Sequence, residues 1–230
     1  MEANKENGSE VFGGNRWHEE DSPWKAKNIF KIIEKNNLTP KSVCEIGCGS
    51  GEVLRDLASY FDSSTKFVGY ETSAEAYTVC KTKEEANIKY ELANLLALDV
   101  QYDLVMAINV LDHVADYLGF LSQLRSKGEY KVFHIPLKTT VYSVLRSSHF
   151  EKKMEMSSYR HSFSKDTALG TLKGTGYEIV DYFYTSGSLE SPNRGSRNKL
   201  WTVPRKLLYA INKDFGVKML GGFSLMVLAK

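Results

Sequence analysis

The sequence predicts a doubly wound α/β domain, in which helices cover both faces of a parallel sheet. Three observations support this prediction. Apolar strands alternate with helical segments from residue 42 onward, and a run of three alternate glycines directly follows the first strand. The chain has 230 residues, of which 42% are hydrophobic, which suits one sizeable core. Strand–helix alternation of this kind is typical of a sheet buried on both sides.

The N-terminal region predicts a polar arm followed by a helix. Residues 1–22 carry six acidic and two basic side chains. A helix is expected from about Ser22 to Asn36, since Pro23 stands in its first turn. Its buried face would consist of Ile29, Phe30, Ile32 and Ile33. We predict that residues 1–40 form an N-terminal arm and helix, acting as a lid or substrate region, and that residues 41–230 form the main domain.

The rest of the chain alternates strands and helices. Seven strands are predicted, at Ser42–Ile46, Lys66–Tyr70, Lys89–Leu92, Tyr102–Ile108, Tyr130–Ile135, Tyr177–Tyr184 and Phe223–Ala229. Helices are expected between them, at about 51–61, 73–86, 115–126, 165–175 and 203–219. Two connections are longer than a compact crossover needs, at about 137–163 and 186–222, and we interpret them as substrate-side insertions.

Composition narrows the class of protein. The net charge of +2 argues against a dedicated nucleic-acid binder. No secretory signal and no apolar stretch long enough to cross a bilayer is evident, so we expect no membrane insertion. The three cysteines form neither a disulfide framework nor a metal-binding spacing. A reduced, cytoplasmic compartment is the simplest expectation.

The glycine-rich segment is the sharpest feature of the sequence. The strand that contains Glu45 ends in Gly47, Gly49 and Gly51, and a helix is expected immediately afterwards. Glycine permits backbone angles and close approaches that a Cβ would block. The carboxyl end of the first strand is where doubly wound sheets bind ligands. The alternative is a simple tight turn.

Two carboxylates indicate which kind of ligand this loop would hold. Glu71 closes the second predicted strand, twenty residues after Gly51, where an acid can accept hydrogen bonds from a ribose diol. That spacing alone also fits NAD. However, the glycines run G-x-G-x-G, and Glu45 stands two residues before the first of them. A carboxylate there would repel a pyrophosphate, but it suits a ligand that carries an ammonium group and a sulfonium.

From about residue 41 onward the chain resembles the class I S-adenosylmethionine-dependent methyltransferases. The resemblance implies a Rossmann-like, seven-stranded sheet that is mostly parallel with an antiparallel last strand, and S-adenosyl-L-methionine as cofactor. It places the glycine loop beneath the cofactor, Glu71 on the ribose, and Glu45 near the methionine ammonium. Asn94 stands where the family usually has an acid facing the adenine. The remaining predicted cofactor contacts are Cys48, Leu95 and Asn109.

Within the family, the chain is most similar to small-molecule enzymes of bacterial sugar and surface-polysaccharide pathways. This likeness lies in less specific motifs: Trp17-His18, residues 22–26, residues 161–164 and residues 221–225. An acceptor of this kind could be anionic or nucleotide-linked. The basic run from Arg194 to Lys218 is then either a recognition surface for that anion or simply a solvated face.

Methyl transfer to oxygen or protonated nitrogen needs alignment and a base. Our first candidate base is His113, which follows the fourth strand; His161 and His134 are the others. The alternative for each is a hydrogen-bonded structural histidine. Asp112 is expected to cap the following helix. Trp17, Trp24 and Tyr77 could stack on the adenine or face the sulfonium, with core packing as the alternative. No metal site is expected.

The sequence therefore predicts an enzyme that transfers a methyl group from S-adenosylmethionine to an oxygen or nitrogen atom of a small molecule. A sugar or surface-polysaccharide precursor is the leading acceptor class. The alternatives are a non-catalytic cofactor-binding module of the same fold and an RNA methyltransferase, although no added basic RNA-binding module is evident. An NAD oxidoreductase is a more distant alternative.

Overall fold

A seven-stranded sheet forms the centre of the molecule, in the order β3-β2-β1-β4-β5-β7-β6. The computed structural model describes residues 16–145, 160–190 and 196–230, so most of the predicted arm lies outside the described residues. β7 pairs antiparallel with both β5 and β6, whereas the other pairs are parallel. The prediction of a mostly parallel sheet with an antiparallel last strand is confirmed.

The strands coincide closely with the predicted ones. They are β1 (Ser42–Ile46), β2 (Lys66–Glu71), β3 (Ile88–Leu92), β4 (Tyr102–Ile108), β5 (Gly128–Leu137), β6 (Ile179–Thr185) and β7 (Phe223–Ala229). Side chains of the central strands alternate between the two faces. In β4, Leu104 and Met106 belong to the core on one face of the sheet, whereas Val105 and Ala107 belong to the core on the other. Burial on both faces explains why β4 is a continuous apolar run.

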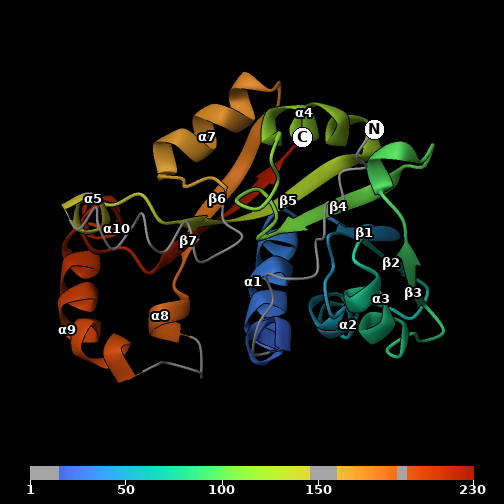
Figure 1. Cartoon of the computed structure of the whole chain (residues 1–230), viewed down its shortest axis with the longest axis horizontal. Coiled ribbons are helices and arrows are strands. Elements are labelled where there is room, and N and C mark those ends of the chain that lie inside the picture. Colours follow the sequence, from blue (N-terminus) through green and yellow to red (C-terminus); the bar gives the residue numbers. More distant parts are fainter. Residues whose placement is uncertain (1–15, 146–159, 191–195) are drawn as a thin grey trace, which may run out of the picture.

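Helices cover both faces. α1 (Ser22–Lys35), α2 (Glu52–Ala58) and α3 (Ala74–Lys81) lie on one side, with α4 (Tyr117–Leu124) and α7 (Lys165–Gly174) on the other (Figure 1). Three short 3₁₀ helices complete these layers: η1 (Arg16–Asp21), η2 (Leu95–Ala97) and η3 (Arg125–Lys127). α1 buries Ile29, Ile32 and Ile33 as predicted, while Phe30 is half-buried and stacks on Tyr60. Each buried isoleucine contributes about 1.5–3 kcal/mol.

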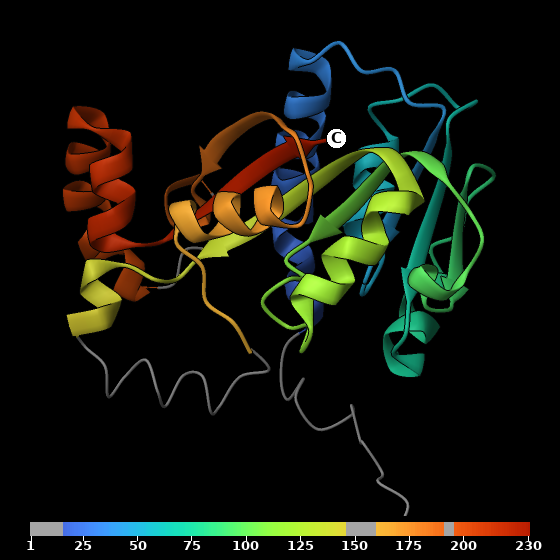
Figure 2. The same ribbon diagram turned by 90° about the horizontal axis from the view of Figure 1, so that it is seen from above.

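The described parts of the two predicted insertions contain four further helices, which we call the cap: α5 (Val141–Leu145), α8 (Gly187–Glu190), α9 (Ser196–Ile211) and α10 (Lys213–Leu220). The expectation of one helix over 203–219 was wrong. Asn212 separates α9 from α10, because its side chain accepts a hydrogen bond from the Phe215 amide and caps α10. Figure 2 shows α5, α9 and α10 gathered at one end of the molecule. None of the helices in the described ranges is long and apolar enough to cross a membrane.

Candidate functional site

The glycine loop joins β1 to α2, at the point where β1 lies between β2 and β4. Gly47, Gly49 and Gly51 all have positive φ, of 68°, 55° and 77°. A Cβ at Gly51 would lie 2.6 Å from the ring of Tyr90, whose hydroxyl donates a hydrogen bond to the Gly51 carbonyl. The loop is therefore held against β3 by a contact that only glycine permits. It lies at the switch point of the sheet, where such folds bind ligands.

Glu71 ends β2 beside this loop. Its Oε2 accepts a hydrogen bond of 2.9 Å from the Gly49 amide, and its Oε1 accepts bonds from the amides of Thr72 and Ser73 at 2.7 and 2.8 Å. These bonds fix the carboxylate and the loop relative to one another. Since a carboxylate oxygen can accept more than one hydrogen bond, Oε2 retains capacity for a ligand hydroxyl.

Glu45 is buried in β1 with only 2% of its surface exposed. Its Oε2 atom has no hydrogen-bond partner among the residues that the structure describes. Burial raises the pKa of Glu45 to about 8, while Lys25 opposes this shift and Glu71 adds to it. An orphaned carboxylate oxygen is costly to bury, so this atom is suited to receive a donor from a bound ligand.

Lys25 is a site residue that sequence reasoning missed. It lies on α1, and burial lowers its pKa, with Asp21, Glu45 and Glu20 acting in the opposite direction. Its charge also acts on His134. No local motif marks this lysine, because only the packing of α1 against the sheet brings it toward the ends of β1 and β5.

The structure argues against His134 as the base. It is buried in β5, its Nδ1 contacts Asn109 Oδ1 at 2.7 Å, and its Nε2 contacts Thr185 Oγ1 at 2.9 Å. Burial, together with the charge of Lys25, lowers the pKa of His134 to about 3. A neutral imidazole with both nitrogens engaged positions its neighbours. Among these is Asn109, which has a φ of +58° directly after β4.

His113 and His161 come together around Asp112. The Asp112 carbonyl accepts the backbone amides of Arg160 and His161, so the chain returns here from the first insertion. His113 Nε2 lies 3.8 Å from Asp112 Oδ1. His161 Nε2 donates to the Ala115 carbonyl at 3.0 Å, and its ring lies 4.5 Å from that of Tyr117.

Asp112 does not cap α4, so that expectation was wrong. Asp116 caps this helix by accepting a hydrogen bond from the Gly119 amide. Asp112 is instead 1% exposed, and its Oδ2 pairs with Lys138 Nζ at 2.6 Å. Its Oδ1, on the side of His113, is buried and accepts no hydrogen bond from the described ranges of the chain. A charged pair thus stands beside the two histidines.

The other predicted cofactor residues are placed as follows. Asn94 is exposed at the start of η2 and accepts a hydrogen bond from the Leu96 amide. The Leu95 side chain is fully buried in the core, so any contact with a ligand would have to involve its backbone. Cys48 is buried, and both its hydrogen bond with Cys80 and its burial raise the pKa of its thiol, which disfavours a nucleophilic role.

Trp24 connects α1 to the cap. Its indole N–H donates to Glu190 of α8 at 3.0 Å, and its ring lies edge-to-face against His134 at 5.9 Å. Trp17 belongs to η1, but its side chain lies outside the described residues. Tyr77, on α3, is partly buried and packs against the core.

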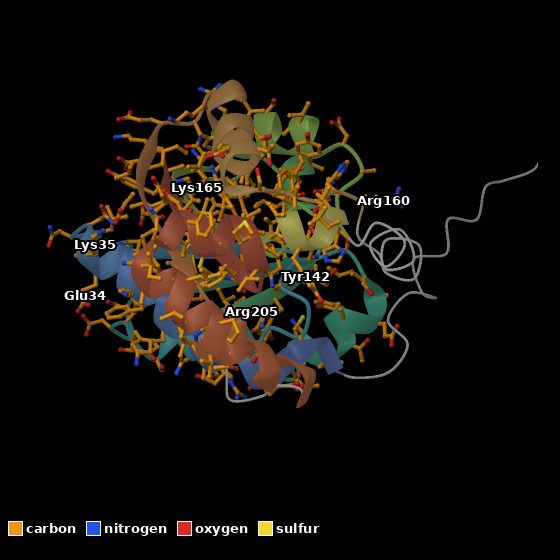
Figure 3. The ribbon with its side chains drawn as sticks, turned by 90° about the vertical axis from the view of Figure 1, so that its left-hand side faces the viewer. Glu34, Lys35, Tyr142, Arg160, Lys165 and Arg205 are labelled. Carbon is orange, nitrogen blue, oxygen red and sulfur yellow. The ribbon has the colours of Figure 1, made fainter. Side chains whose placement is uncertain are left out.

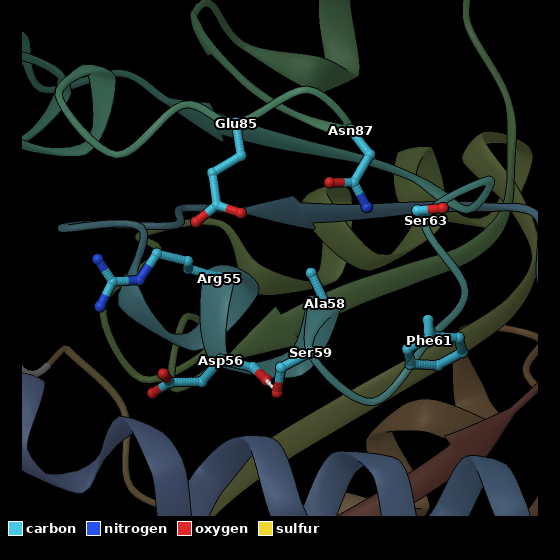
Figure 4. A pocket seen from close by; sticks show the side chains of 8 residues that line it. All are labelled: Arg55, Asp56, Ala58, Ser59, Phe61, Ser63, Glu85 and Asn87. Carbon is cyan, nitrogen blue, oxygen red and sulfur yellow. Dashed lines mark hydrogen bonds between the residues drawn. The ribbon is translucent and has the colours of Figure 1, made fainter.

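Two hollows lie away from this site. One, of about 370 Å³, is lined by residues that include Arg55, Asp56, Glu85 and Asn87 (Figure 4). Glu85 and Asn87 directly precede β3, so this hollow lies near the amino ends of the strands, whereas the glycine loop lies at their carboxyl ends. The other, of about 450 Å³, lies near Lys41 and Asp103, at the beginnings of β1 and β4. Among the described side chains, no group of three metal-ligating residues gathers.

Comparison with known proteins places the chain in a family. A family model described as a methyltransferase domain matches residues 17–182. The tRNA U34 carboxymethyltransferase of Campylobacter concisus is 26% identical over 46% of this chain and 38% of its own length. The ubiquinone biosynthesis O-methyltransferase of Rickettsia typhi is 28% identical over 42% of each. The matched segment thus spans less than half the length of these curated relatives.

A solved structure shows the same fold. The magnesium protoporphyrin IX methyltransferase of Synechocystis, crystallised with bound SAH, is 17% identical and aligns with a TM-score of 0.60. The alignment covers 91% of this chain and 82% of that one. With the family model spanning most of the chain and the sheet order described above, the chain belongs to the class I S-adenosylmethionine-dependent methyltransferase family.

Proposed function

We propose that this protein transfers a methyl group from S-adenosylmethionine to an oxygen or nitrogen atom of a small molecule. The observation that carries the proposal is the buried Oε2 of Glu45, which has no described partner and lies just before the glycine loop. The charge of Glu71 helps to raise the pKa of Glu45. Two acidic side chains at this position disfavour the pyrophosphate of a dinucleotide, whereas a cationic ligand favours the ionised form of Glu45.

The residues at the loop fit this cofactor. Glu71, already fixed by three backbone amides, would accept the ribose hydroxyls, and Glu45 would accept the ammonium group directly or through water. The φ angles of Gly47 and Gly49 shape the loop on which the ligand would lie. Asn94 would face the adenine. When bound, S-adenosylmethionine supplies the electrophilic methyl group.

We assign the base to His113. Its ring is 33% exposed, so an acceptor hydroxyl or ammonium can reach it. The Asp112 carboxylate 3.8 Å away would stabilise the imidazolium that forms when His113 takes the acceptor's proton. His161 is the reserve candidate: its Nε2 donates to a carbonyl, which leaves Nδ1 to accept a proton.

The acceptor we propose is a sugar or surface-polysaccharide precursor, anionic or nucleotide-linked. Its support is the resemblance in residues 161–164 and 221–225, together with a cap rich in basic side chains. The three free cysteines are consistent with a reduced, cytoplasmic setting. The similarity to a tRNA-modifying enzyme keeps RNA as a second acceptor class, although it covers only 38% of that relative.

Calorimetry on the purified chain tests the proposal. We expect S-adenosylhomocysteine to bind with a dissociation constant on the order of micromolar, about −8 kcal/mol, and NAD not to bind. Tight binding of NAD without binding of S-adenosylhomocysteine would contradict it. Binding of S-adenosylhomocysteine without turnover on any nucleotide-sugar, small-molecule or RNA acceptor would favour a non-catalytic module.

A further inference from the structure

Arg205 of α9 is buried, and no acidic side chain among the described residues pairs with it. It is 9% exposed, and its Nε and Nη1 atoms have no hydrogen-bond partner within the described part of the chain. Burial lowers its pKa, and the described group that opposes this shift is the phenol of Tyr142, with no carboxylate contributing. Removing one partner of a buried guanidinium–carboxylate pair is strongly unfavourable, because it leaves a charge in the protein interior without compensation. A guanidinium that is buried without such a partner therefore calls for an explanation.

The orientation of α9 makes this burial more unusual. Val203, Leu207 and Ile211 recur at four-residue spacing and are 73%, 61% and 72% exposed. Arg205 and Tyr209, also four residues apart, instead turn inward, and Tyr209 stacks on Phe223 at the start of β7. Burial of apolar surface alone would select the opposite rotation of the helix. The inward face of α9 therefore buries a cation at the expense of three apolar side chains.

The cap, which contains Arg205, follows the carboxyl ends of β5 and β6, at the same end of the sheet as the candidate site. α5, which carries Tyr142, follows β5 through Lys138, the residue paired with Asp112. α8 follows β6, whose last residue Thr185 contacts His134, and its Glu190 receives the Trp24 indole. Figure 3 shows Arg205 on α9 and Tyr142 on α5 at the end of the molecule where the cap lies.

We propose that Arg205, with Tyr142 beside it, binds an oxyanion of the methyl acceptor, a phosphoryl or carboxylate group. This inference rests on the proposed methyltransferase function, of which it specifies the substrate class. The buried guanidinium has two donor atoms, Nε and Nη1, without a described partner, and a charged N–H donor of this kind bonds strongly to an oxygen of a phosphoryl or carboxylate group. Of the basic residues described in the run up to Lys218, Lys206, Lys213 and Lys218 are exposed, which separates Arg205 from the solvated ones.

The test measures thermal unfolding and calorimetric binding of the full chain with saturating S-adenosylhomocysteine, using pyrophosphate and malonate as probes. A response to pyrophosphate identifies a phosphoryl site, and a response to malonate identifies a carboxylate site. We expect Arg205→Met to weaken binding of the preferred probe about tenfold or more. Arg205→Lys keeps the positive charge but loses the planar guanidinium, so its affinity for the probe should lie between those of the wild type and Arg205→Met. Lys206→Met on the same helix removes an equal charge from an exposed position and should bind as the wild type does.

A second readout separates binding from a structural role. Without probe, Arg205→Met should melt at a higher temperature than the wild type, because the unpaired buried charge is gone. The proposal is overturned if neither probe binds the wild type, if Arg205→Met binds as well as Lys206→Met, or if Arg205→Met is destabilised or fails to fold. Failure of the proposed function is distinct, since then the wild type would not bind S-adenosylhomocysteine.

Discussion

Burial determines what the ionisable residues of the site can do. Glu45 on β1 and His134 on β5 are both buried, on the two strands that flank β4, yet their situations differ. His134 has a partner for each ring nitrogen and its pKa falls to about 3, so it remains neutral and positions Asn109. The Oε2 atom of Glu45 has no partner among the described residues, and the pKa of Glu45 rises to about 8, so this oxygen is suited to a hydrogen-bond donor from a ligand. The same desolvation thus keeps His134 neutral in a structural role and leaves Glu45 suited to receive a donor from a ligand.

The Glu71 carboxylate should be required for cofactor affinity. Glu71→Ala removes the acceptor of the Gly49 amide and of the expected ribose hydroxyls, so we expect a loss of about 1.5–3 kcal/mol per charge-assisted bond. Calorimetric titration with S-adenosylhomocysteine measures it. Glu75→Ala, an exposed acid on α3, is the matched control. An unchanged dissociation constant for Glu71→Ala would show that the ribose is held elsewhere.

His113 should be required for turnover but not for cofactor binding. We expect His113→Ala to reduce kcat by about 10²–10⁴ while S-adenosylhomocysteine affinity stays nearly unchanged. The measurement is a pH–rate profile under saturating acceptor, with His161→Ala in parallel. Full activity of His113→Ala with loss in His161→Ala would exchange the two roles. Full activity of both would mean that another group or solvent takes the proton.

At the scale of elements, local patterns predicted the sheet well and the cap poorly. All seven predicted strands are present, because each is either an apolar run, as in β4, or an alternation of apolar and polar residues, as in β3. α5 and α8 are short and lie within insertions without strong periodicity. The break between α9 and α10 depends on the Asn212 side chain. Glu45 and the glycines are contiguous in sequence and Glu71 follows at a recognisable spacing, whereas only tertiary packing brings Lys25 close to Glu45 and buries Arg205.

The start of α2 should tolerate no side chain at residue 51. Gly51 has a φ of +77°, and a Cβ at this position would lie 2.6 Å from the Tyr90 ring. We therefore expect Gly51→Ala to lower the free energy of unfolding by about 1–3 kcal/mol and to weaken cofactor binding. Gly170→Ala in α7 is the control. Its Cβ meets no atom within 4 Å, and a helical interior should gain about 0.5–1 kcal/mol. Urea unfolding of both variants measures this; equal effects would contradict the packing argument.

At the scale of the whole molecule, α1 links the sheet to the cap. Its inner face packs against both β1 and β7, since Ala26, Ile29, Ile32 and Ile33 share one core with Val43 and Leu228. Its Trp24 reaches Glu190 of α8, and its Lys25 acts on Glu45. The family model also begins at residue 17, ahead of this helix. The predicted boundary at residue 40 therefore falls after an element that packs into the main core.

Glu45 and His134 should also shape the pH dependence of folding stability. Glu45 has its pKa raised from 4.5 to about 8, so the folded state holds more protons and the stability it contributes, full below pH 4.5, is lost as pH rises through 8. His134 has its pKa lowered from 6.5 to about 3, so its contribution is full above pH 6.5 and is lost as pH falls through 3. The two slopes oppose each other between pH 4.5 and 6.5.

Between pH 6.5 and 8 the Glu45 slope acts without the opposing one, so the difference in stability between wild type and Glu45→Gln should change across this window. We expect the wild type to lose stability relative to Glu45→Gln as pH rises, measured by urea unfolding at several pH values. Saturating S-adenosylhomocysteine should reduce the slope, because its ammonium group favours the ionised carboxylate and its binding releases a proton from Glu45. Calorimetry in buffers of different ionisation enthalpy detects that proton. Parallel pH curves for the two proteins, with no proton released on binding, would show that Glu45 is ionised before the ligand arrives.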